Sequence, residues 1–273
     1  MRYTKKKLYS AQVPISPSHE AYIKSYLKNL NKIRINQILI IVSFLFLWEI
    51  TTRLKILNSF IFSSPSRVVK CFADMAADGS IFYHIGITLF ETLVSFSLVI
   101  IIGILVAVLL WWNNNIAKTL EPYLVVLNSL PKSALAPVFI VWLGNNVKTI
   151  IIAAISVAVF GSIISLYTDF ISVEEDKVKL IRTLGGNKRD VLFKVVIPSN
   201  IPSILSVMKV DIGLSLVGVI IGEFLAANAG LGYLIIYGSQ VFKLDWVIMS
   251  IVILCVMAAG LYQLLTYFEN KYN

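Results

Sequence analysis

Charged residues are scarce in this chain, because Asp, Glu, Lys and Arg make up only 14% of its 273 residues. Soluble domains carry roughly 25%. Hydrophobic residues make up 58%, and apolar runs of about twenty residues recur, each long enough as a helix to cross a hydrocarbon core of ~30 Å. These runs lack the alternation of membrane-spanning strands. The sequence therefore predicts an all-α integral membrane protein.

Catalytic and metal-binding side chains are equally few. The two cysteines, Cys71 and Cys255, lie far apart, which argues against a disulfide framework or a metal site. His19 and His84 have no cysteine or second histidine beside them, and no Ser/His/Asp arrangement can be built. The phosphate-binding pattern GxxxxGK[ST] does not occur. We therefore expect no enzymatic activity, metal or cofactor on this chain.

Six transmembrane spans are predicted, at residues 35–50, 85–112, 119–143, 147–167, 200–225 and 246–268. The basic segment 1–34 precedes a transmembrane domain at 35–273, whose core is 85–268. No small-residue cleavage site follows the first apolar run, so we expect an uncleaved span there. The connection after it, residues 51–83, is expected to include a short interfacial helix beginning near Pro65.

Lysine and arginine are distributed unevenly between the two sides of this topology. Sixteen fall on the side of the termini and of residues 173–198, and six fall on the other side. Positive charge is retained in the cytoplasm. We therefore expect a multi-pass membrane protein with both termini cytoplasmic. Orientation accounts for the net charge of +9, and no nucleic-acid partner is expected.

Residues 173–198 form a polar stretch between two apolar spans, VEEDKVKLIRTLGGNKRDVLFKVVIP, which we call the polar island. Its pattern predicts a helix over 174–184 with an acidic first turn, a stop at Gly185-Gly186 and a second helix over 188–196. Pro198 ends the stretch. Such a unit could insert into a groove on a partner protein or lie on anionic lipid headgroups.

Three sequence motifs, which follow one another along the chain, help to decide between a partner protein and lipid headgroups. TLG at 183–185, nine further residues and VVIP at 195–198 resemble the coupling-loop motif of permease subunits of bacterial ABC importers. Two others, LPKSALAP at 130–137 with WLG at 142–144, and GEFLAA at 222–227 with GLGYLI at 230–235, resemble the branch that handles nitrate, sulfonate, taurine and some vitamin precursors. The chain departs from the motif at 179–181, where Lys-Leu-Ile replaces the usual Glu-Ala-Ala element.

The resemblance implies a type I ABC importer permease fold in the bacterial cell membrane, with the polar island as a coupling helix in a cleft of a cytoplasmic ATPase subunit. It implies three further components: ATP-Mg on that ATPase, an extracytoplasmic substrate-binding protein, and a second copy of this chain at the pathway. The residues that it assigns to ATPase coupling are Ile181, Arg182, Leu184, Gly185, Gly186 and Pro198.

Lys132 lies between Pro131 and Pro137 within the third span. A cation inside the membrane is expected to face the bundle interior or water. Both prolines are expected to break the helix, which is tolerated where backbone lines a cavity. Two interpretations stay open for Lys132, a role in the solute pathway and an ion pair with an acid of a neighbouring span.

The fifth span and the segment after it hold the other candidate gate residues. By resemblance, Glu223, Gly230 and Gly232 belong to an outer gate and a landing surface for the binding protein; the alternative is an interfacial loop anchored by aromatic rings. The intramembrane charges Glu91, Lys209, Asp211 and Glu223 either pair with one another or contact solute. The small-residue row Ser215, Gly218, Gly222 and Ala226 predicts close helix packing, within the subunit or against a second one.

Together these features predict the pathway-forming permease subunit of an ABC importer for a small organic or inorganic solute such as a sulfonate, nitrate or vitamin precursor. The alternative is an ion-coupled secondary transporter that uses the intramembrane acids. That class is built from inverted repeats, and no repeat is evident in this sequence.

Overall fold

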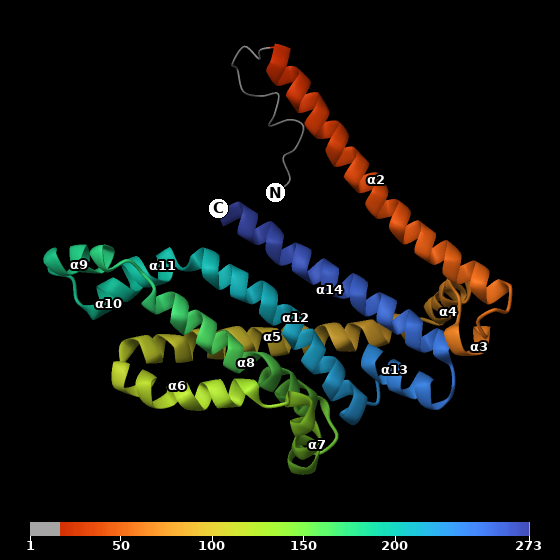
Figure 1. The fold of residues 1–273 in the computed structure, drawn as a ribbon. Coiled ribbons are helices and arrows are strands. Elements are labelled where there is room, and N and C mark those ends of the chain that lie inside the picture. Colours follow the sequence, from red (N-terminus) through yellow and green to blue (C-terminus); the bar gives the residue numbers. More distant parts are fainter. Residues whose placement is uncertain (1–16, 273) are drawn as a thin grey trace. The chain divides into compact units, whose positions relative to one another are not determined.

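The computed structural model describes residues 17–272, and every regular element in that range is a helix (Figure 1). The first sixteen residues of the basic segment 1–34 lie outside the described residues. The chain divides into two compact units, Met1–Pro65 and Ser66–Asn273. The first of the predicted spans therefore falls in one unit and the remaining five fall in the other.

The first unit contains α2 (Pro17–Arg53) and the short helix α3 (Ser59–Phe62). The predicted span 35–50 lies within α2, and the helix continues through residue 34 without a break. Residues 18–34 contain neither glycine nor proline, so nothing in the sequence stops the helix from extending. The indole nitrogen of Trp48 donates to the carbonyl oxygen of Phe62 at 3.2 Å, which ties α3 back to α2.

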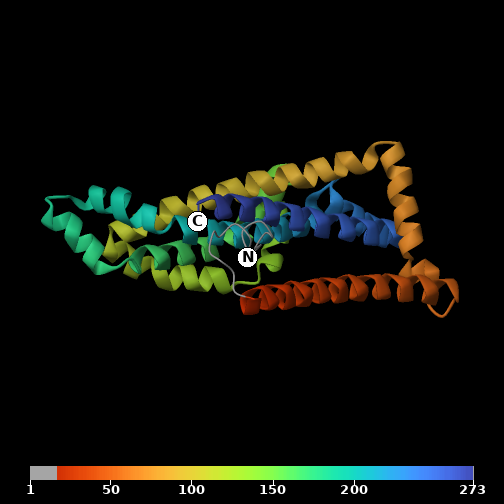
Figure 2. The same cartoon turned by 90° about the horizontal axis from the view of Figure 1, so that it is seen from above.

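Four long helices form the frame of the second unit. They are α5 (Ser80–Trp112), α8 (Val147–Ile171), α12 (Ile201–Ala226) and α14 (Leu244–Tyr272). Each contains most or all of one predicted span, and each is long and apolar enough to cross a membrane. Helix α12 packs against α5, α8 and α14, and α5 also packs against α8 (Figure 2). The core of the unit lies along these contacts.

The small-residue row on α12 packs within this unit. A Cβ atom on Gly218 would lie 2.6 Å from Cα of Ala154, and one on Gly222 would lie 2.9 Å from a methyl carbon of Ile150. Ala154 and Ile150 both belong to α8. Backbones can approach so closely only where the side chain is absent. The glycines therefore set the distance between α8 and α12.

The third predicted span is not a single helix. The structure instead has α6 (Asn114–Ser129) and α7 (Lys132–Leu143), which are bent by 94° with respect to each other. The break falls at Leu130 and Pro131, because proline disfavours a helical conformation in the residue before it, and Leu130 has an extended backbone with ψ 141°. Pro137 lies inside α7 without ending it. The expectation that both prolines break the helix is therefore wrong for Pro137.

The polar island contains four short elements in place of two helices. They are α9 (Glu175–Thr183), α10 (Lys188–Val191), the π-helical turn η1 (Leu192–Val196) and α11 (Ile197–Ser199). The stop at Gly185-Gly186 and the second start at Lys188 are as predicted, but the second helix changes to π-helical pairing at Leu192. A buried cluster that includes Phe170, Val191 and Val196 joins this loop to the ends of the spans.

The other end of the second unit carries α4 (Pro65–Ala77) and α13 (Leu231–Gln240). Both lie at the far end of the long helices from the polar island (Figures 1 and 2). Helix α4 begins at Pro65, as predicted. Helix α13 occupies the middle of the segment after the fifth span, which the sequence predicts to be either an outer gate or an interfacial loop.

Candidate functional site

The second helix of the polar island has a fixed start. The Asn187 side-chain oxygen accepts from the amide nitrogens of Arg189 and Asp190 at 2.8 and 3.1 Å, and the Asp190 carboxylate accepts from the Asn187 amide at 3.0 Å. This reciprocal arrangement is a capping box. Hydrogen bonds from Lys194 and from the Asn187 amide hold the pKa of Asp190 below its usual range. Asn187 was not predicted from the sequence, although Asn three residues before Asp signals this cap.

The two glycines of the island serve different purposes. Gly185 has φ +83°, a conformation that side chains disfavour, but a Cβ atom there would meet nothing within 4 Å. A Cβ atom on Gly186 would lie 2.5 Å from a methyl carbon of Ile181. The amide of Gly186 also donates to the Ile181 carbonyl at 2.9 Å. Gly185 is therefore required by the turn and Gly186 by space.

Helix α9 presents two faces. Ile181 packs inward with Val178 against the buried cluster around Phe170, whereas Leu184 is 75% exposed and Leu180 is 59% exposed. Of the two leucine and isoleucine contacts with the ATPase that the sequence predicts, Leu184 is therefore available to a partner, whereas Ile181 packs inside this protein. Leu180 joins Leu184 on the exposed side. The sequence marks Leu180 only as part of the departure at 179–181.

Pro198 lies in α11, directly before the start of α12. This is the join to the fifth span that the sequence predicts. The exposed Arg182 lies in the last turn of α9.

At the opposite end of α12, Glu223 is 1% exposed. Its carboxylate accepts hydrogen bonds from the Thr88 hydroxyl at 2.6 Å and from the amide of Gly232. A Cβ atom on Gly230 would overlap this carboxylate, and one on Gly232 would lie 2.7 Å from it. The structure therefore brings together all three residues that the sequence singled out in this region, and the glycines leave room for the acid.

Two further side chains complete the attachment of α13 to the bundle. The amide of Gly230 donates to His84 Nδ1 at 3.0 Å, and the amide of Leu231 donates to the Thr88 hydroxyl at 2.8 Å. The first amides of a helix have no partner within it, and here α5 and α12 provide the acceptors. A lone histidine at a span edge was the only sequence signal for His84, and Thr88 had none.

The charged groups within the spans fall into buried and accessible sets. Glu91, Asp211 and Glu223 are each at most 2% exposed. Lys209 forms an ion pair of 2.8 Å with Glu269 on α14. Lys132 is only partly buried at the bend between α6 and α7, where its ammonium donates to the carbonyl oxygen of Asn128.

Pairing between Lys132 and an acid was one of the two interpretations from the sequence. Within residues 17–272 the contacts of Lys132 are instead with Asn128, whose side-chain oxygen lies 3.4 Å from its ammonium. The ammonium thus donates to a backbone carbonyl near the C-terminal end of α6. It remains the accessible charge at the bend.

Comparison with known proteins identifies the family. Residues 99–272, more than half of the chain, match the family model described as "Binding-protein-dependent transport system inner membrane component". The chain belongs to this family. The matched residues include the polar island, α12 and α13.

Named relatives are transport permeases. The chain is 30% identical to the formylaminopyrimidine transport permease protein ThiX of Halalkalibacterium halodurans, over 68% of this chain and 74% of the relative. It is 24% identical to the putative aliphatic sulfonates transport permease protein SsuC of Bacillus subtilis, over 77% and 76%. It is 22% identical to the taurine transport system permease protein TauC of Escherichia coli, over 77% and 78%.

Solved structures show the same fold. An inward-facing form of the MetNI methionine ABC transporter matches with a TM-score of 0.62 at 17% identity, over 71% of this chain and 96% of that one. An amino acid ABC transporter matches with a TM-score of 0.56 at 18% identity, over 73% and 97%. The protein is thus an ABC importer permease with a type I fold and several membrane spans.

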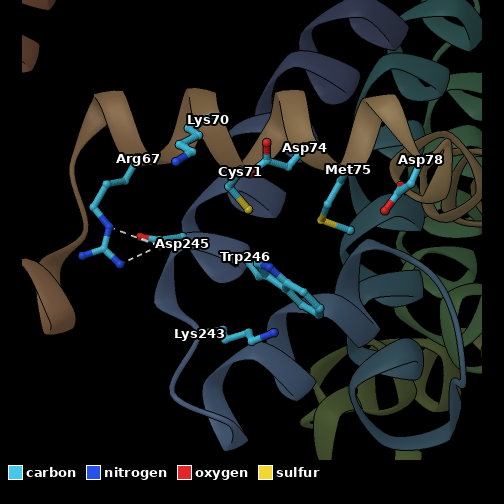
Figure 3. A pocket seen from close by; sticks show the side chains of 9 residues that line it. All are labelled: Arg67, Lys70, Cys71, Asp74, Met75, Asp78, Lys243, Asp245 and Trp246. Atoms are coloured by element: carbon cyan, nitrogen blue, oxygen red, sulfur yellow. Dashed lines mark hydrogen bonds and ion pairs between the residues drawn. The ribbon is translucent and has the colours of Figure 1, made fainter.

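The permease has a polar groove of about 580 Å³ between α4 and the connection from α13 to α14 (Figure 3). Arg67 on α4 and Asp245 at the start of α14 pair across it at 2.7 Å. The Cys71 thiol points into the groove (Figure 3). Burial, followed by the nearby Asp245 and Asp74 charges, raises its pKa. The groove therefore favours the thiol form of this cysteine over the thiolate.

Proposed function

We propose that this permease forms the solute pathway of an ABC importer together with a second copy of itself, and that the polar island receives the motion of a cytoplasmic ATPase. The observation that supports this most strongly is the pair of exposed apolar side chains Leu180, on α9, and Leu184, which caps the end of α9, on a loop otherwise rich in charge. Large exposed apolar side chains on a polar loop favour a protein partner. Lysine and arginine distribution supports a cytoplasmic position for the island and both termini.

Helix α12 supports the coupling route. At one end it follows directly from η1 and α11 of the polar island, and at the other end Glu223 holds the start of α13. A helix of 26 residues is about 39 Å long, which is enough to span the membrane as one rigid element. Movement of the island would therefore be transmitted through α12 to α13, which we propose acts as the outer gate.

The energy source in this scheme is a partner chain. With no GxxxxGK[ST] pattern in the sequence, we assign ATP-Mg to the ATPase subunit. An extracytoplasmic binding protein would deliver solute at the α4 and α13 end, where the groove of Figure 3 opens.

The solute class follows from which charges are accessible. Three acids of the spans are buried in the helix packing, whereas Lys132 is partly exposed at the bend. An accessible cation within the membrane is expected to face water or a partner subunit rather than lipid. This favours a small solute that carries a sulfonate or another group with acceptor oxygens. The names of the sulfonate and taurine permeases among the relatives support the same class.

Co-purification tests the docking assignment. The permease is expressed with each candidate ATPase subunit and binding protein from its own genome, and the ratio of ATPase to permease is measured after purification. We expect Leu184→Glu to lose the ATPase while the permease still inserts in the membrane, because a charge then replaces an apolar contact. The matched control is Val69→Glu, at an exposed apolar position on α4. Full ATPase recovery with Leu184→Glu would contradict the assignment.

A further inference from the structure

The inner face of α9 borders a pocket of about 440 Å³ that the proposed ATPase contact does not use. Its wall includes Trp111 at the end of α5 and Phe170 at the end of α8, and three cations line it: Lys179, Arg182 and Lys188. Glu175 is the acid in the lining, and it pairs with Lys179 at 3.1 Å. Two cations therefore remain without a carboxylate partner in the lining.

The contacts of Lys188 show where the pocket lies along the membrane spans. Its ammonium nitrogen lies 5.5 Å from the ring centroids of both Trp111 and Trp112, and it donates to the carbonyl oxygen of Trp112. Tryptophans at the ends of membrane spans lie at the level of the lipid headgroups. An ammonium group has three donors, so Lys188 retains donors for a ligand at this level.

The two faces of α9 separate the pocket from the proposed docking surface. Glu175, Val178, Lys179 and Arg182 recur at helical spacing on the pocket side. Leu180 and Leu184 lie roughly opposite, since successive helical residues turn by about 100°. A ligand in the pocket would therefore leave the exposed leucines free for a protein.

We propose that this pocket binds the phosphate group of an anionic phospholipid. The phosphate oxygens accept hydrogen bonds from Lys188 and Arg182, the two cations without a carboxylate partner in the lining. Charged donors form the strong hydrogen bonds to phosphate. Basic pockets between spans at the cytoplasmic surface are suited to such headgroups. The apolar wall at Trp111 and Phe170 lies where the lipid continues toward its acyl chains. The polar island then rests on lipid with one face and offers the other to the ATPase.

Native mass spectrometry of the purified full-length permease tests this site. Bound lipid is measured at equal concentrations of phosphatidylglycerol and phosphatidylcholine, for the wild type and for the double variant Lys188→Gln/Arg182→Gln. Each cation near a membrane surface strengthens binding to an anionic lipid several-fold. We therefore expect phosphatidylglycerol binding to fall about tenfold or more in the double variant, with phosphatidylcholine binding unchanged.

The matched control is Lys177→Gln/Arg189→Gln, which removes two cations from the same island but outside the pocket. It should keep the preference for phosphatidylglycerol. The conservative variant Lys188→Arg/Arg182→Lys should keep it too, which separates loss of charge from loss of fold. An equal loss in the control and the pocket variant would overturn the proposal.

Two further arms distinguish other occupants. Inorganic phosphate at millimolar concentration is added without lipid; saturation of the site by phosphate alone, with no gain from the lipid, would overturn a lipid site. The pocket variant is also purified with the ATPase. Loss of the ATPase with phosphatidylglycerol binding unchanged would assign the pocket to the protein partner and refute the lipid assignment.

Discussion

Thr88→Val is the perturbation that most sharply tests how α13 is held. Valine has nearly the shape of threonine, so the substitution removes a hydroxyl and leaves the packing in place. Two hydrogen bonds are lost, from the hydroxyl to the Glu223 carboxylate at 2.6 Å and from the Leu231 amide to the hydroxyl at 2.8 Å. Thr88 is fully buried, so water does not replace the lost partners.

The magnitude follows from these two bonds. An intramolecular hydrogen bond contributes about 0.5–1.5 kcal/mol, and a buried amide left without an acceptor costs about 1–3 kcal/mol. Thr88→Val should therefore lower the free energy of unfolding by about 1.5–4.5 kcal/mol. The matched control is Thr92→Val, one turn further along α5. Thr92 is equally buried, but its hydroxyl bonds only to the Thr88 carbonyl at 2.7 Å, so we expect a loss of about 0.5–1.5 kcal/mol.

Reversible unfolding in mixed micelles with sodium dodecyl sulfate, followed by tryptophan fluorescence, measures both values. Limited proteolysis of the segment that holds α13 should show faster cleavage in Thr88→Val alone. If Thr88→Val and Thr92→Val destabilise the protein equally and leave proteolysis unchanged, the hydroxyl does not hold α13 and the reasoning fails.

Three further predictions concern the turn, the helix packing and the groove. Gly185→Ala should lower the free energy of unfolding by about 1 kcal/mol because Gly185 has a positive φ, and Gly186→Ala should lower it by about 2 kcal/mol or more because its Cβ atom meets Ile181. Limited proteolysis of the polar island compares the two variants. Faster cleavage in Gly185→Ala than in Gly186→Ala would contradict the geometry. Gly218→Val should destabilise the α8–α12 contact by about 1–3 kcal/mol in the same unfolding assay, and a neutral effect would count against the close approach to Ala154. The raised pKa of Cys71 means less thiolate at any given pH, so maleimide labelling should reach its half-maximal rate at a higher pH than for a free cysteine. Asp74→Asn removes a negative charge near the thiol and should move this half-maximal point to lower pH. No change would show that the Asp74 charge does not act on the thiol.

The long elements were predictable because each is encoded locally. The apolar runs identified α8 and α12 within a few residues, since a span needs about twenty apolar residues in succession. Gly185-Gly186 located the turn of the polar island, since glycine ends a helix through a conformation that other residues disfavour. These signals depend on nothing outside a short window of sequence.

The remaining features depend on partners distant in the chain or on helix phase. Thr88 and Leu231 are 143 residues apart, so no local pattern relates them. Leu180 and Ile181 are adjacent and both apolar, and only the packing of α9 shows which one faces outward. Pro131 and Pro137 look equivalent in sequence, but only Pro131 lies at a bend.

Solute uptake into sealed proteoliposomes tests the central claim most directly. The permease is reconstituted with its ATPase and binding protein, and labelled solute is followed with ATP on the ATPase side or with an imposed proton or sodium gradient in its absence. We expect uptake that requires ATP and the binding protein, and that falls to background with Leu184→Glu. Uptake driven by the ion gradient without ATP would contradict the account and would favour a secondary transporter.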